Sequence, residues 1–187
     1  IFRIQQRLSW TQEFGQWTRT MGIKNYLIDG VSCAGKTTVC GELQRRGYHA
    51  VHGDRELAYW GDLETGEPVA GGADAQRAWL WDVAKVSALA ADQSQAATFF
   101  CGGSRNAGRF LGLFDAVFVL QIDRETLERR LAARSPTEWG GTAQEGEAFA
   151  RRQQATNEGL PANAIMVDAT APLATVVDTI LEHVNGV

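Results

Sequence analysis

The sequence predicts an α/β fold in which a five-stranded parallel sheet has helices on both faces. Five short apolar segments alternate with stretches of helical periodicity, which is the pattern of a parallel sheet with helical crossovers. A glycine-rich loop joins the first apolar segment to the first helical one. The composition, with 44% hydrophobic and 21% charged residues in 187 positions, is typical of one globular domain with a sizeable core.

The five predicted strands are apolar almost throughout, as expected for strands that are buried on both faces. The first ends at Ile28, and the others span residues 48–52, 97–101, 116–122 and 164–167. Ligands of such sheets bind at the carboxyl ends of the strands. The loops that follow the five strands are therefore expected to meet around one site.

The helices are predicted from apolar residues at helical spacing and from residues that typically begin or end a helix. The first helix covers residues 36–46 and ends before Gly47, which can adopt the left-handed conformation of a C′ residue. Asp123 is expected to cap a helix at residues 124–134. The other predicted helices span residues 73–92 and 145–156, and the last one stops at Gly186.

A stretch rich in Gly, Asp and Pro, residues 53–72, is too long for a simple connection and is interpreted as an excursion that holds substrate. Trp60 lies in this excursion and is our candidate for stacking on a base or a sugar. Trp79 has a place on the apolar stripe of the helix predicted at residues 73–92, so core packing is expected for it.

Residues 1–20 precede the first predicted strand and are interpreted as an N-terminal extension of a domain that covers residues 21–187. Trp10, Phe14 and Trp17 would form an apolar stripe if the extension were helical. Such a stripe fits packing on the domain or on a second subunit, so a monomer and a homodimer both stay open.

The charge and cysteine content limit the partners and the compartment. A net charge of −4 gives no basic field that would attract a nucleic acid polymer or an anionic membrane, so a small-molecule partner is expected. The three cysteines form no C-x-x-C pair, which favours reduced thiols in a cytoplasm. No segment has the apolar length of a membrane span.

The loop after the first strand matches the phosphate-binding pattern G-x-x-x-x-G-K-[ST]. Its glycines let successive backbone N–H groups and the following helix N-terminus face an anion. Lys36 is expected to reach the β- and γ-phosphates of ATP, and the Thr37 hydroxyl to ligate Mg²⁺. The residues expected to bind ATP here are Gly30, Val31, Ser32, Cys33, Ala34, Gly35, Lys36, Thr37 and Thr38.

Four further motifs accompany this loop. They are His-Gly-Asp-Arg-Glu-Leu at residues 52–57, Cys-Gly-Gly-Ser-Arg at 101–105, the arginine-rich segment 124–134, and Val-Asp-Ala-Thr-Ala-Pro at 167–172. With these motifs the chain resembles the small P-loop kinases of the adenylate kinase-like group, which includes nucleoside monophosphate, shikimate and gluconate kinases. The resemblance covers roughly residues 24–184 and implies a P-loop NTPase fold with strand order 2-3-1-4-5, and ATP and Mg²⁺ as cofactors.

The resemblance also implies roles for two residues beyond the phosphate loop. Asp54 matches an acidic residue that handles the phosphoryl acceptor or Mg²⁺, although an aspartate at this place also suits a turn or a helix cap. Arg105 matches the arginine that clamps the acceptor's phosphate, for which a bidentate, always charged guanidinium is suited. A solvated surface arginine is the alternative reading of Arg105.

The same resemblance implies a lid at residues 135–144 that closes over ATP. Arg130 and Arg134, four apart on one helix face, would act as its arginines, because an anion between them would relieve their mutual repulsion. A charged solvent face, partly neutralised by Glu128, is the alternative. Arg151 and Arg152 are weaker candidates to complete the clamp.

The loop after the last strand resembles the segment that lies against the adenine in these kinases. This implies that Ala169 and Pro172 contact the base. Thr170 is also expected to cap the final helix, with Pro172 in its first turn.

The chain departs from the family pattern at Cys101, which occupies the position of an acidic residue. A thiol is a poor ligand for Mg²⁺. Either Asp54 or Asp29 would then supply the carboxylate that supports the metal.

Together these motifs predict an ATP-dependent kinase that acts on a small molecule. A nucleoside or nucleoside monophosphate is the first choice of acceptor, and a sugar acid, a shikimate-like molecule or an antibiotic hydroxyl is the second. A nucleotide-binding or NTPase module without a small acceptor is a third reading, which Cys101 favours.

Overall fold

The structure is a computed structural model that describes residues 24–70, 77–133 and 161–186. Its main sheet has five parallel strands in the order β2-β5-β1-β6-β7. Counted along the chain within this sheet, the order is 2-3-1-4-5, which confirms the predicted order and fold class. The strands are β1 (Lys24–Gly30), β2 (His49–His52), β5 (Ala97–Cys101), β6 (Ala116–Gln121) and β7 (Ile165–Asp168).

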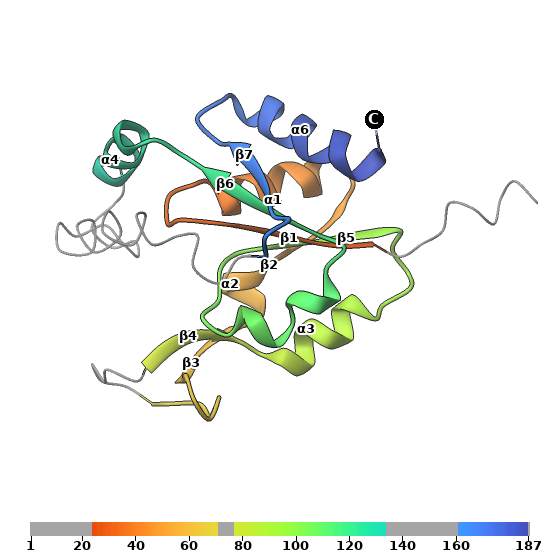
Figure 1. The fold of residues 1–187 in the computed structure, drawn as a ribbon, viewed down its shortest axis with the longest axis vertical. Coiled ribbons are helices and arrows are strands. Elements are labelled where there is room, and N and C mark those ends of the chain that lie inside the picture. The colour runs from red at the N-terminus through yellow and green to blue at the C-terminus, as the bar shows by residue number, and fades with distance from the viewer. Residues whose placement is uncertain (1–23, 71–76, 134–160, 187) are drawn as a thin grey trace, which may run out of the picture.

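Helices cover both faces of this sheet, as Figure 1 shows. α1 (Lys36–Arg45) and α6 (Leu173–Asn185) lie on one face and α3 (Val83–Ala90) lies on the other. Neighbouring strand residues alternate between the two faces: Ile28 packs in the core under α1 and α6, and Leu27 in the core under α3. The central strands are therefore buried on both sides. Burying one such side chain stabilises the fold by roughly 1.5–3 kcal/mol.

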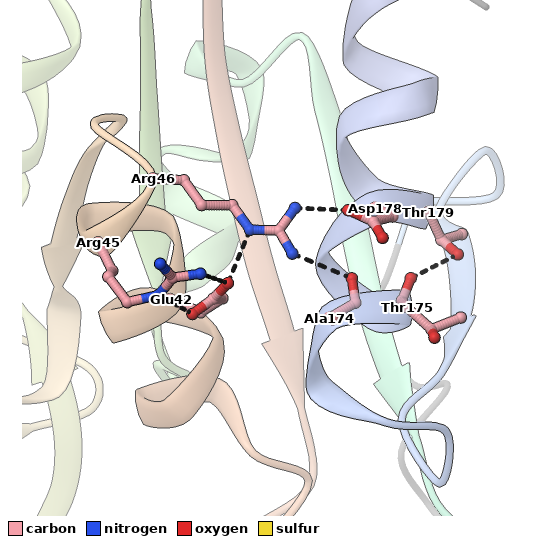
Figure 2. Close-up of polar contacts among 7 residues, drawn as sticks. All are labelled: Glu42, Arg45, Arg46, Ala174, Thr175, Asp178 and Thr179. Atoms are coloured by element: carbon pink, nitrogen blue, oxygen red, sulfur yellow. Dashed lines mark hydrogen bonds and ion pairs between the residues drawn. The ribbon is translucent and has the colours of Figure 1, made fainter.

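The end of α1 is fixed to α6 by a polar contact (Figure 2). Glu42 accepts hydrogen bonds at 2.7 Å from Nε of both Arg45 and Arg46. Arg46 continues to Asp178 and to the carbonyl of Ala174 on α6. Arg46 therefore joins the carboxylates of two helices that lie side by side on the sheet.

The helix predicted at residues 73–92 is wrong over its first part. β4 (Arg77–Trp81) pairs with β3 (Ala58–Asp62) as an antiparallel hairpin, and α3 begins only after Asp82. Asp82 accepts from the backbone N–H groups of Ala84 and Lys85, so it is the N-cap that separates strand from helix. The excursion predicted at residues 53–72 contains regular structure, namely α2 (Gly53–Glu56) and β3.

Most other predicted helix boundaries agree with the structure. Asp123 caps α4 (Arg124–Ala132) by accepting from the backbone N–H of Thr126 at 2.7 Å. Gly47 after α1 has φ +87° and Gly186 after α6 has φ +71°, as C′ glycines do. The predicted cap at Thr170 is wrong, because its hydroxyl group donates to Asp168 and no side chain caps α6.

Several predictions concern residues outside the described ranges: the extension 1–20, the lid 135–144 and the helix 145–156. Within the described residues, two short 3-10 helices (Ala107–Arg109 and Leu111–Leu113) follow β5. None of the helices that the structure describes has the length and apolar character needed to cross a membrane.

Candidate nucleotide and acceptor site

The glycine-rich loop connects the end of β1 to the start of α1. At Gly30 the backbone has φ +147° and passes so close to β6 that a Cβ would lie 2.6 Å from the carbonyl oxygen of Leu120. Gly35 has φ +105° and is the N-cap of α1. Glycine at these two positions therefore lets the loop leave the sheet and enter the helix within a few residues.

The ammonium group of Lys36 lies over this loop. Its Nζ donates to the carbonyl oxygens of Gly30 at 2.6 Å and Val31 at 3.0 Å. Cys33, at the turn of the loop, has φ +67°, and the N–H of Ala34 bonds back to the carbonyl of Val31. Lys36 thus holds a positive charge directly against the loop backbone.

The N-terminus of α1 has no acidic residue in its own first turn, and its N-cap, Gly35, has no side chain that could cap it. The side chains of Thr37 and Thr38 in this turn are exposed. Free N–H groups and the helix dipole favour an anion at such an end, and α1 presents this end beside Lys36.

Arg130, on α4, joins the loop to the segment after β7. Its guanidinium donates at 3.0 Å to the carbonyl oxygens of Cys33 and Ala34, and at 2.8 Å to that of Ala169. Arg130 is partly buried by these contacts, which does not fit the solvent-face reading. Arg134, its predicted partner, lies outside the described residues, as do Arg151 and Arg152.

Three strands end at the same level beside the loop. Cys101 is in register with Ile28 on one side and His52 on the other, so the residues that follow all emerge together. Gly103 lies between the two carboxylates of this edge. Its N–H donates to Oδ1 of Asp54 at 3.3 Å, and a Cβ on it would lie 3.0 Å from Oδ1 of Asp29.

Asp54 is exposed, and its hydrogen bonds to other described residues are made by one oxygen. Its Oδ1 also accepts from the indole Nε1 of Trp81 at 3.4 Å. Among the described residues, neither the backbone N–H groups nor the side chains donate to Oδ2 of Asp54. Asp54 is not a helix cap here, because α2 has no side-chain cap.

Asp29 is the more buried of the two carboxylates. Its Oδ1 accepts from the N–H of Gly30 at 2.7 Å. Burial raises the pKa of Asp29, while the nearby charge of Lys36 and this hydrogen bond act in the opposite direction. The charges of Lys36 and of Asp54 both act on the pKa of Asp29, so the three groups lie close together.

Cys101 provides neither an acid nor a metal ligand. It is 3% exposed. The neighbouring thiol of Cys40 and burial raise the pKa of Cys101 well above its usual value, so it is a neutral thiol at neutral pH. Among the described residues, no group of three or more His, Cys, Asp or Glu side chains could hold a metal ion by itself.

Trp81, which the sequence suggests only as one of several tryptophans that could stack on a base or a sugar, has a packing role in the site that the sequence did not predict. Its indole lies between two glycines: a Cβ would come within 2.1 Å of Cζ2 at Gly53 and within 2.6 Å at Gly102. The ring stacks on Phe110 with centroids 5.7 Å apart and planes 4° apart. Glycine directly after two strand ends was the signal that a large side chain approaches there.

Asn106 and Ser104 fix the backbone of Trp81. The side-chain amide of Asn106 donates to the Trp81 carbonyl at 2.9 Å, and its Oδ1 accepts from the Trp81 N–H at 3.0 Å. The hydroxyl of Ser104 accepts from the same N–H and donates to Asn106. The loop after β5 is thereby bound to β4 through both the backbone N–H and the carbonyl group of Trp81.

Arg105 lies in the same loop and is exposed. Its backbone N–H donates to the carbonyl of Trp79 at 3.0 Å. No salt bridge of its guanidinium is found within the part of the chain that the structure describes. On the opposite side of the site, Ala169 is buried and Pro172 is exposed at the start of α6.

Comparison with known proteins places this architecture. No curated protein matches the sequence. A sugar kinase from Janibacter sp. HTCC2649 is 18% identical with a TM-score of 0.55, covering 88% of this chain and 95% of that one. Shikimate kinase from Acinetobacter baumannii, solved with shikimate, is 14% identical with a TM-score of 0.58, covering 90% and 97%.

These similarities confirm, at the level of the fold, the resemblance to small P-loop kinases. Residues 27–150 match the AAA domain family. Because this match spans more than half of its residues, the chain belongs to the AAA domain family.

Proposed function

We propose that this protein transfers the γ-phosphoryl group of ATP to a small molecule, with Mg²⁺ as the metal. The observation that carries the proposal is the arrangement around Gly103. Gly103 lies against the carboxylates of Asp29 and Asp54, and the ammonium of Lys36 at the start of α1 lies close enough for its charge to act on Asp29.

The donor half of the site is the glycine-rich loop. Lys36 would exchange the carbonyls of Gly30 and Val31 for the β- and γ-phosphates. Arg130 places a further positive charge behind the loop, where it supports charge that develops on the transferred group.

The donor set also fits Mg²⁺. This ion usually takes one or two protein oxygens and completes its shell with water and phosphate oxygens. Thr37 in the exposed first turn of α1 would supply one oxygen, and Asp54 or Asp29 would act from the neighbouring strand ends. Bound there, Mg²⁺ would neutralise charge on the β- and γ-phosphates.

The acceptor half is assigned to Asp54 and Arg105. Oδ2 of Asp54, which accepts no hydrogen bond from the described residues, would orient an acceptor hydroxyl or phosphate, and the exposed Arg105 would hold an anionic group on the acceptor. A nucleoside or nucleoside monophosphate is our first choice. A sugar acid, a shikimate-like molecule or an antibiotic hydroxyl is the second.

A nucleotide-binding module without a small acceptor is the competing proposal. The neutral thiol of Cys101 at the position of an acidic residue favours it, because one carboxylate fewer is present to support the metal.

The deciding experiment measures ADP release from ATP and Mg²⁺ with a panel of nucleosides, nucleoside monophosphates and hydroxy acids. A kinase shows turnover well above background with at least one acceptor. Lys36→Ala should lower that turnover by about 10²-fold or more, since it removes a charge that acts on the transferred group. Background rates with every acceptor would favour the binding module instead.

A further inference from the structure

The β3–β4 hairpin carries three tryptophans on one face. Strand side chains alternate between faces, and the register pairs Trp60 with Trp79 and Ala58 with Trp81. Trp60, Trp79 and Trp81 therefore lie on the same face. Tyr59 and Leu80, which are paired with each other, lie on the opposite face.

One end of this tryptophan face is part of the candidate site. The indole of Trp81 lies against Gly53 and Gly102 and donates to Asp54. Trp79 is two residues away from Trp81 along the same strand face, and Trp60 lies across from it. The tryptophan face thus continues outward from the carboxylate that would orient the acceptor.

The hairpin is also fixed relative to that carboxylate. Asn106 binds both backbone groups of Trp81, and Arg105 donates its backbone N–H to the carbonyl of Trp79. The loop after β5 is consequently hydrogen-bonded to β4 at both Trp79 and Trp81. The exposed side chain of Arg105 starts next to Trp79 for the same reason.

The outer two indoles pack edge to face. The ring centroids of Trp60 and Trp79 lie 4.9 Å apart with planes at 64°, and both side chains are only partly buried. In this geometry the edge of one ring meets the face of the other, and part of each side chain remains exposed. A flat ring can stack on the exposed part of an indole.

We infer that Trp60 and Trp79 receive the ring of the phosphoryl acceptor, so that the acceptor is a cyclic compound with an anionic substituent near Arg105. This inference rests on the proposed function and narrows its acceptor class. A nucleotide base and a carbocyclic ring both offer the required face. An open-chain sugar acid does not, and the hairpin therefore disfavours it.

The test compares Trp60→Leu and Trp79→Leu with the wild type. Shikimate, deoxyadenosine and adenosine monophosphate are the cyclic acceptors, and gluconate and glycerate are the open-chain ones. Trp60→Phe and Trp79→Phe keep a ring at each position. Tyr59→Leu is the matched control, because it makes the same kind of change on the opposite face of the same strand.

For a cyclic acceptor we expect KM to rise about tenfold in each Leu variant. Turnover at saturation should change less than about twofold, since the indoles hold the ring and do not touch the reacting atoms. The Phe variants should recover most of the wild-type KM, and KM for ATP should stay constant throughout. An equal effect of Tyr59→Leu would overturn the inference, because it would reduce the tryptophans to hairpin packing.

Failure of the inference and failure of the proposed function give different results. Turnover of gluconate or glycerate, with none of the cyclic acceptors used, overturns the inference and leaves the kinase intact. If no acceptor supports turnover, the kinase proposal fails, and calorimetric binding of the cyclic compounds with a non-hydrolysable ATP analogue decides. Binding that is lost in the Leu variants supports the ring site, and no binding to the wild type overturns it.

Discussion

The closest packing around the candidate site depends on a single missing carbon atom. Gly53 has ordinary helical backbone at the start of α2, yet a Cβ there would lie 2.1 Å from the indole of Trp81. Because the indole is also stacked on Phe110, it has little room to move away. We predict that Gly53→Ala lowers the free energy of unfolding by about 1–3 kcal/mol, the usual cost of overpacking a core.

Gly41 supplies the matched control for this prediction. It lies inside α1, and a Cβ there would meet no atom within 4 Å. Gly41→Ala should therefore stabilise the protein by roughly 0.5–1 kcal/mol, since alanine favours the helix and nothing is displaced. Urea unfolding of both variants measures the two signs. A Gly53→Ala variant as stable as the wild type would show that the Trp81 indole is not fixed between the glycines.

At the scale of elements, the carboxylate of Glu42 near the end of α1 makes stability depend on pH. Hydrogen bonds from Arg45 and Arg46 lower the pKa of Glu42 from 4.5 to about 2. A carboxyl whose pKa is lower in the folded state stabilises the protein above its unfolded pKa. That stability is lost as the pH falls through the folded value. The contribution of Glu42 should thus be present above about pH 4.5 and vanish near pH 2.

Glu42→Gln tests this window. We expect the variant to be less stable than the wild type at pH 7 and the difference to disappear by about pH 2, measured as denaturant midpoints across the range. Added salt should also reduce the difference at pH 7, because the Arg45 side chain in this contact is 71% exposed and its charge is screened. Glu182→Gln on the exposed side of α6 is the control, because it removes a carboxylate that lies outside this contact.

Some helices and strands could be predicted from their own residues, and others could not. The sheet strands were predictable because each is a short apolar run, and their order followed from the resemblance to P-loop kinases. The hairpin was not, because Trp79, Val83 and Val86 fit helical spacing, whereas the strand at residues 77–81 exists through pairing with residues 58–62. Such pairing is a long-range contact that local periodicity cannot contain.

In the candidate site, too, some residues could be located from the sequence and others could not. The loop with Lys36 and the strand-end Asp54 could be located from the sequence because their motifs are contiguous and follow strands. Asn106 and Trp81 could not, since their roles arise from backbone contacts between segments that are 25 positions apart. Residues that position others leave a weaker local signal than residues that bind ligand.

At the scale of the whole molecule, the candidate site is built from the segments that follow β1, β2 and β5 together with Arg130 on α4, so a ligand that binds it should stabilise the fold as one unit. ATP with Mg²⁺ at about a hundred times its Kd adds about 2.7 kcal/mol to the free energy of unfolding. For a domain of this size that corresponds to a rise in Tm of about 5–10 °C. Lys36→Ala should lose most of the rise, because the ammonium that faces the phosphates is gone. The comparison uses each variant's own ligand-free Tm, since Lys36 also bonds Gly30 and Val31 without ligand. An equal rise in wild type and Lys36→Ala would place the ATP site elsewhere in the chain.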